Sequence, residues 1–118
     1  MPERSADDPD DALAAVLAKL AVSARQANLA RSEVLAEALT AVADGRLDES
    51  QRAAAQQAAH QIAGSAGTFG AHRASAVASS LEAYFAAPEA ERVAGLGPAR
   101  VQLEELRRDL DAGHQVEE

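Results

Sequence analysis

One histidine in the middle of the chain has neighbours that suit chemistry on its ring. His60 is followed by Gly64, Gly67 and Gly70 in a segment that otherwise has the composition of a helix. A glycine inside a helix costs about 0.5–1 kcal/mol relative to alanine, so Gly64 and Gly67 need a reason. Residues three, four and seven apart share a helix face, which places both glycines beside His60. We therefore expect an exposed imidazole next to a surface cleared of side chains.

The other face of this helix is apolar and is expected to face the core. It carries Ala55, Ala58, Ala59, Ile62, Ala66 and Phe69. Of these, the two large side chains, Ile62 and Phe69, are predicted to be buried. Gly64 could instead permit close packing of a neighbouring helix, but the direction of its face argues against that use.

A carboxylate on the following helix is predicted to lie level with His60. A tight turn at residues 68–70 joins the two helices, and His60 precedes it by about as many residues as Glu82 follows it. A carboxylate that accepts the Nδ1 proton fixes the tautomer of the imidazole. The Nε2 atom then points outward with its lone pair free and can act as a nucleophile.

The run from His60 to Gly70 resembles the phosphoacceptor motif of histidine phosphotransfer (HPt) domains. That motif reads His, any residue, a branched aliphatic, usually Lys, Gly, a small residue, Ala, a small residue, any residue, Phe or Leu, Gly. Ala63 departs from it, because many family members carry a lysine there, near the phosphate. The family commonly bears a Glu or Gln 22 residues after the acceptor, and Glu82 occupies that position. The resemblance implies that His60 is the acceptor and that Glu82 orients its ring.

The resemblance further implies a relay in two-component signalling. His60 would take a phosphoryl group from the phosphoaspartate of a receiver domain and pass it on. The implied partners are response-regulator receiver domains and a hybrid histidine kinase. The residues expected to meet a receiver are Gln57, Gln61, Ala63, Gly64 and Gly67. No glycine-rich phosphate loop and no kinase signature is present, so we expect no autonomous kinase activity.

Two other functions fit the same residues. A pseudo-HPt adaptor would bind receivers without accepting phosphate, and the missing lysine at Ala63 keeps this alternative open. A structural helical oligomerisation module is the other alternative, and the long first helix motivates it.

Composition narrows the function classes. The chain has 118 residues, which is the usual size of one domain. Hydrophobic residues make up 47% of it and are mostly alanine, and aromatic residues make up 3%; this composition favours close-packed helices. A net charge of −8 disfavours binding to nucleic acid or to an anionic membrane. There is no cysteine, and Asp111 and His114 form the one Asp-x-x-His pair, so no metal and no other cofactor is expected. Without a signal peptide or membrane span, we expect a cytoplasmic protein, which the resemblance implies to be a monomer.

Helical periodicity and capping residues divide the chain. We expect a disordered leader (1–9), a single HPt-like bundle domain (10–113) and a flexible tail (114–118). The expected helices span residues 10–44, 49–67, 71–87 and 98–113, with a looser connector at 89–97. The first is one long helix, or a short helix that runs into a long one with a bend near Asn28, and Gly45 ends it. Its N-terminal part is expected to overhang or cap the bundle.

The boundaries of the other helices follow from their end residues. Asp48 and Gln51 form a capping box at the start of the second helix. Pro88 stops the third, and Pro98 is expected at the first position of the last. Four amphipathic helices with short connections predict an all-α protein, an antiparallel four-helix bundle with an extended N-terminal helix.

Overall fold

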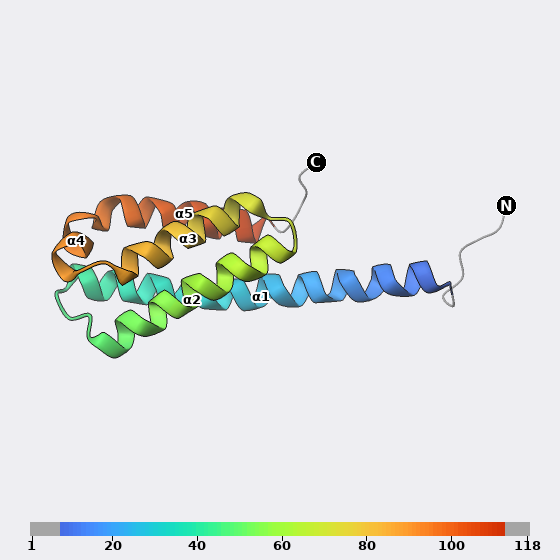
Figure 1. Cartoon of the computed structure of the whole chain (residues 1–118), viewed down its shortest axis with the longest axis horizontal. Coiled ribbons are helices and arrows are strands. Elements are labelled where there is room, and N and C mark those ends of the chain that lie inside the picture. The colour runs from blue at the N-terminus through green and yellow to red at the C-terminus, as the bar shows by residue number, and fades with distance from the viewer. Residues whose placement is uncertain (1–7, 113–118) are drawn as a thin grey trace.

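The described part of the chain is entirely helical. The computed structural model describes residues 8–112, and within them five helices follow one another without a strand (Figure 1). The helices are α1 (Pro9–Ala43), α2 (Glu49–Thr68), α3 (His72–Ala86), α4 (Glu89–Ala94) and α5 (Leu96–Asp111). The all-α prediction is confirmed. The predicted leader up to residue 7, Gly113 and the tail at 114–118 lie outside the described residues.

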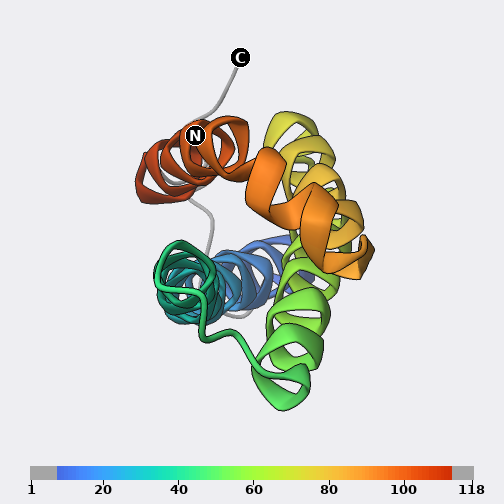
Figure 2. The ribbon, with the colours of Figure 1, turned by 90° about the vertical axis from the view of Figure 1, so that its left-hand side faces the viewer.

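Four of the helices form the predicted antiparallel bundle. Each packs on two neighbours, α1 and α3 both lying between α2 and α5, as the end-on view shows (Figure 2). The core combines a few large side chains with many alanines, and the largest buried ones are Leu35, Ile62, Leu81, Phe85 and Leu106. Small alanine side chains on α2 let its neighbours approach closely, and the most extensive contact between any two helices is that of α2 with α3.

The connections on either side of α2 are set by glycine. Gly45 and Gly70 have φ angles of 67° and 81°, which only glycine adopts without strain. Each follows a helix end in a Schellman motif: Arg46 N donates to Ala41 O at 2.9 Å, and Ala71 N donates to Ala66 O at 2.8 Å. The predicted capping box of Asp48 is also present. These local signals fix where α2 begins and ends.

The first helix is continuous and longer than the bundle. Of the two alternatives, a single helix is the one observed, with no break at Asn28. Asn28 is buried, and its Nδ2 donates to Ser65 Oγ of α2 at 3.2 Å. Residues 9–20, which we call the overhang, project past the other helices (Figure 1). Leu13, Leu17 and Leu20, which lie on this segment, are therefore exposed.

The C-terminal helices differ from the prediction in their boundaries. The connector contains a complete short helix, α4, and α5 begins at Leu96 rather than at Pro98. Pro98 is the third residue of α5. It is tolerated there because the N–H groups of a helix's first turn have no intrahelical partner. The Tyr84 hydroxyl donates to Arg92 O at 2.6 Å and ties α3 to α4, and burial raises the pKa of Tyr84.

Candidate functional site

The predicted histidine and carboxylate face each other across α2 and α3. His60 Nδ1 lies 3.0 Å from Glu82 Oε2. A carboxylate oxygen can only accept a hydrogen bond, so in the neutral imidazole the proton lies on Nδ1 and Nε2 keeps its lone pair. The His60 side chain is 65% exposed and that of Glu82 is 31% exposed. The imidazole is thus accessible to a macromolecule while one of its nitrogens is held by the protein.

The surface next to His60 is low on its Gly64 side. A Cβ placed on Gly64 would meet no atom within 4 Å. Gln57 and Gln61 are exposed on the same helix, and Ala63 is half-buried. The open space over Gly64 means that its missing side chain serves neither α3 nor the core. The alternative that Gly64 permits close helix packing is therefore not the arrangement observed.

Gly67 differs from Gly64 in its surroundings. A Cβ at Gly67 would lie 3.3 Å from Ser75 Oγ of α3, tighter than ordinary contact. Gly67 is half-buried, so its small size favours the close approach of the two helices at the start of α3. Helical spacing predicted that Gly67 lies on the surface that meets a partner. In the structure, Gly67 also lies where α2 closely approaches α3.

Two hydrogen bonds between α2 and α3 bracket the His60–Glu82 pair. Ser75 Oγ donates to Ala63 O at 2.8 Å on one side, and Arg52 Nη1 donates to Phe85 O at 3.0 Å on the other. Both bonds join the helices directly, so they hold α2 and α3 in the register that brings the imidazole opposite the carboxylate. Sequence patterns gave no signal for either bond, because each depends on which residues the packed helices bring together.

Arg52 is itself fixed by neighbours on α2. Its guanidinium donates to Glu49 Oε2 at 2.7 Å and to Gln56 Oε1 at 2.6 Å. The hydrogen bond from Arg52 lowers the pKa of the Glu49 carboxyl. Glu49 and Gln56, which lie on either side of Arg52 along α2, therefore hold its guanidinium in place where it reaches α3.

Arg73 forms ion pairs with α5. It points toward α5, with its Nε 3.7 Å from Asp109 Oδ2 and its Nη2 3.9 Å from Glu105 Oε2. Position 63 carries alanine in place of the family's lysine. The residue at position 63 therefore adds no positive charge beside the imidazole.

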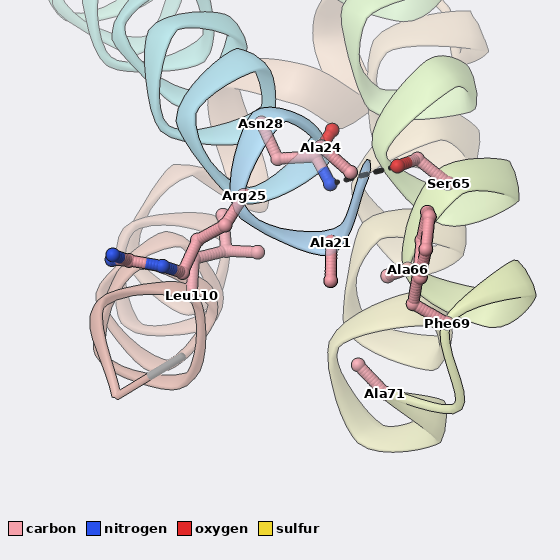
Figure 3. Close-up of a pocket in the computed structure, with 9 residues that line it drawn as sticks. All are labelled: Ala21, Ala24, Arg25, Asn28, Ser65, Ala66, Phe69, Ala71 and Leu110. Atoms are coloured by element: carbon pink, nitrogen blue, oxygen red, sulfur yellow. Dashed lines mark hydrogen bonds between the residues drawn. The ribbon is translucent and has the colours of Figure 1, made fainter. Parts of the chain in front are cut away.

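One prediction, which concerned Phe69, was wrong. Phe69 was expected to be buried, but it is half-buried at the end of α2. Together with Ala21, Ala24, Ala66 and Leu110 it lines a small pocket at the base of the overhang (Figure 3). Local periodicity assigned Phe69 to the core side correctly, but the bundle ends there and leaves one side of the ring uncovered. Ile62, the other residue of the pair, is fully buried as predicted.

The described residues contain neither a metal-binding cluster nor a membrane-spanning helix. Between residues 8 and 112, no three histidine or acidic residues come together in a group that could hold a metal ion. No helix in the same range is long and apolar enough to cross a bilayer.

The layout of this bundle is that of a phosphotransfer domain, and comparison with known families agrees. Residues 20–115 match the Hpt domain family. Because the match covers most of the chain, the protein belongs to this family, whose members are phosphotransfer domains of two-component systems that generally interact with receiver domains. No curated protein and no solved structure matches the chain.

Replacing Ser75 by alanine tests the bond that joins α3 to α2. Ser75→Ala removes the hydrogen bond to Ala63 O, and we expect the free energy of unfolding to fall by about 0.5–1.5 kcal/mol relative to the control. The control is Ser79→Ala, which makes the same change at an exposed position of the same helix. Urea denaturation of both variants measures the difference. Equal stabilities would show that the bond does not hold the register.

Proposed function

We propose that His60 is a phosphoacceptor that takes a phosphoryl group from the phosphoaspartate of a receiver domain and passes it to another. One observation carries the proposal: an exposed imidazole whose Nδ1 lies 3.0 Å from Glu82 Oε2. A histidine on a helix surface ordinarily has no such partner at the level of its ring. Membership of the Hpt domain family supports the same role.

The chemistry needs only one nitrogen of this chain. The lone pair of His60 Nε2 attacks the phosphorus of the acyl phosphate, and the bond from phosphorus to the aspartate oxygen breaks. The aspartate leaves as a carboxylate, and the imidazole becomes a cation that keeps its Nδ1 proton. Glu82 stands beside that proton and offsets the new positive charge. No proton has to leave the site in either direction, so the same steps run backwards when the next receiver arrives.

The receiver would supply the charge stabilisation. By family resemblance it brings its own Mg²⁺ and lysine, while this chain supplies a positioned nucleophile. Phosphoryl transfer depends mainly on positioning and on charge stabilisation, so the two tasks can lie on two proteins. Ala63 fits this division because it adds no cation at the acceptor.

The docking face would surround the open side of His60. Gln57, Gln61 and Gly64 are exposed there, and Ala63 is half-buried at its edge. Gly64 leaves room for the loops of a receiver to reach Nε2. Gly67 belongs to this face by sequence, but its contact with Ser75 gives it a smaller share of the docking surface. The cytoplasmic location expected from the sequence stays a prediction.

A second candidate is the pseudo-HPt adaptor. Ala63 favours it, since the missing lysine removes one charge that would hold the phosphoryl group. An adaptor would use the same face for binding a receiver, and its imidazole would take no phosphate.

Transfer from a phosphorylated receiver separates these two candidates. Incubation of the protein with a radiolabelled phosphoreceiver should produce acid-labile, base-stable label, as expected for phosphohistidine. The His60→Gln variant should carry none, because no nucleophile remains at that position. The receivers encoded in the same genome form the panel, and His72→Gln is the control, since His72 is exposed at the start of α3.

The outcomes assign the function. Label that persists in His60→Gln would remove His60 as the acceptor. Receiver binding without any label would favour the adaptor.

Filling the space over Gly64 should block transfer and leave the fold intact. Gly64→Leu places a branched side chain in the approach path, and we expect the transfer rate to fall at least about tenfold through weaker docking. The helix itself should gain stability, because leucine is a better helix former than glycine. Ala54→Leu, also exposed on α2, is the control. Normal transfer by Gly64→Leu, measured beside thermal unfolding, would show that Gly64 lies outside the docking face.

Glu82 is expected to act as a positioning residue through its hydrogen bond. Glu82→Ala removes the acceptor, and we expect transfer to slow by about tenfold, the value of one hydrogen bond to a charged group at a partly exposed site. Glu82→Gln keeps an oxygen acceptor and should retain most of the rate. Receiver affinity, measured separately, should be the same in both variants. Equal rates for all three proteins would make Glu82 an ordinary surface residue.

A further inference from the structure

The overhang exposes a row of large apolar side chains. Leu13, Leu17 and Leu20 are 57%, 50% and 51% exposed, and Val16 lies between them at 52%. Their spacing places them on one side of α1. Exposed apolar side chains are ordinary when scattered, but a continuous row on a projecting helix marks an interaction surface.

This row continues the face by which α1 packs in the bundle. At about 100° per residue, Leu17 lies on the same side of the helix as Asn28 and Leu35, which are buried against the other helices. Ala24 and Phe69 line the pocket where the bundle ends and the uncovered part of the face begins (Figure 3). The overhang therefore presents a core-type surface with nothing packed on it among the described residues.

The position of the bundle restricts how a second copy could cover this face. The bundle lies on the same side of α1 as the apolar row. Two copies aligned in parallel through the row would drive their bundles into each other. An antiparallel arrangement avoids this collision, because each bundle then lies beyond the N-terminal end of the other overhang.

The lengths of the two segments also agree. Residues 9–24 span about 24 Å of helix. When Leu13 of one copy lies opposite Leu20 of the other, and Val16 opposite Leu17, Pro9 comes level with Ala24 of the other copy. The first turn of α1 in each copy would then cover the Phe69 pocket of the other copy. The apolar row of each overhang would be covered by that of the other.

Charges along the helix favour the same direction. The first turn of α1 is acidic, with Asp10 and Asp11, whereas Arg25 lies at the base of the overhang, with its side chain turned away from Phe69 (Figure 3). Asp10 and Arg25 lie within about 60° of each other around the helix, on the same flank of the row. Antiparallel pairing brings Asp10 of one copy near Arg25 of the other, whereas parallel pairing would set acidic turns side by side.

We propose that two copies of this chain pair antiparallel through their overhangs. Such a pair buries on the order of 1,000 Å² in total, which is the lower end for a specific interface. We therefore expect a dimer of moderate affinity. The proposal replaces the monomer that family resemblance implied and does not depend on phosphotransfer. His60 lies outside the paired segment and stays open in both copies.

Sedimentation analysis of the full chain over the micromolar range tests the pairing. We expect a reversible dimer whose dissociation constant rises at least about tenfold in Leu17→Asp, because a carboxylate would be buried among apolar side chains. Val22→Asp is the matched control: Val22 is 49% exposed but lies on the opposite side of the helix, and its dimer should be unchanged. His60→Gln should also dimerise normally, which separates this result from the fate of the proposed function.

Cysteine cross-linking tests the direction, since the chain has no cysteine of its own. Leu13→Cys and Leu20→Cys proteins should form a disulfide with each other when mixed under mild oxidation, and little when kept apart. Disulfides in each protein alone would indicate a parallel pair and overturn the arrangement. A monomer at all concentrations, or a dimer that Leu17→Asp does not weaken, would overturn the proposal. A monomer that binds lipid vesicles through Leu17 would assign the row to a membrane surface instead.

Discussion

The axial register between α2 and α3 is the constraint on which the site depends. The imidazole of His60 and the carboxylate of Glu82 come from different helices, and their 3.0 Å approach exists only in one alignment. A slip of one residue would move Glu82 by about 1.5 Å along the axis and turn it by about 100°. The glycine-set turn at Gly70 and the Ser75 bond to α2 fix that alignment, so the imidazole is positioned by helix packing.

The parts of this structure that were predicted from the sequence are those governed by local physics. Asp48 caps α2 because a side-chain oxygen can satisfy a free N–H, and Gly45 and Gly70 end helices because glycine adopts a positive φ. Helical periodicity separated the core-facing residues of α2 from the exposed ones, and counting from the turn predicted that Glu82 lies level with His60. Each of these inferences needs only neighbours within a few turns.

The features that sequence reasoning missed arise where the chain meets distant parts of itself. Phe69 is half-buried because the bundle ends beside it. The position of Pro98 is an exception with a local reason, because the first turn of α5 tolerates a missing N–H donor. Arg52 reaches a carbonyl of α3 that no pattern could indicate. The apolar row of the overhang has the same periodicity as the buried part of α1. Periodicity therefore could not tell which half of that helix has a partner within the molecule.

In the proposed function, the placement of His60 within a regular helix affects how quickly a receiver can bind and dissociate. A histidine on a loop would have to be ordered at each encounter, and that loss of entropy would weaken or slow the complex. On α2 the His60 ring and its neighbours are ordered before a receiver binds. The imidazole is therefore oriented even in a weak complex. For the phosphoacceptor role proposed for His60 this property matters, because the protein must release one receiver before it meets the next, and a short residence time then favours rapid transfer.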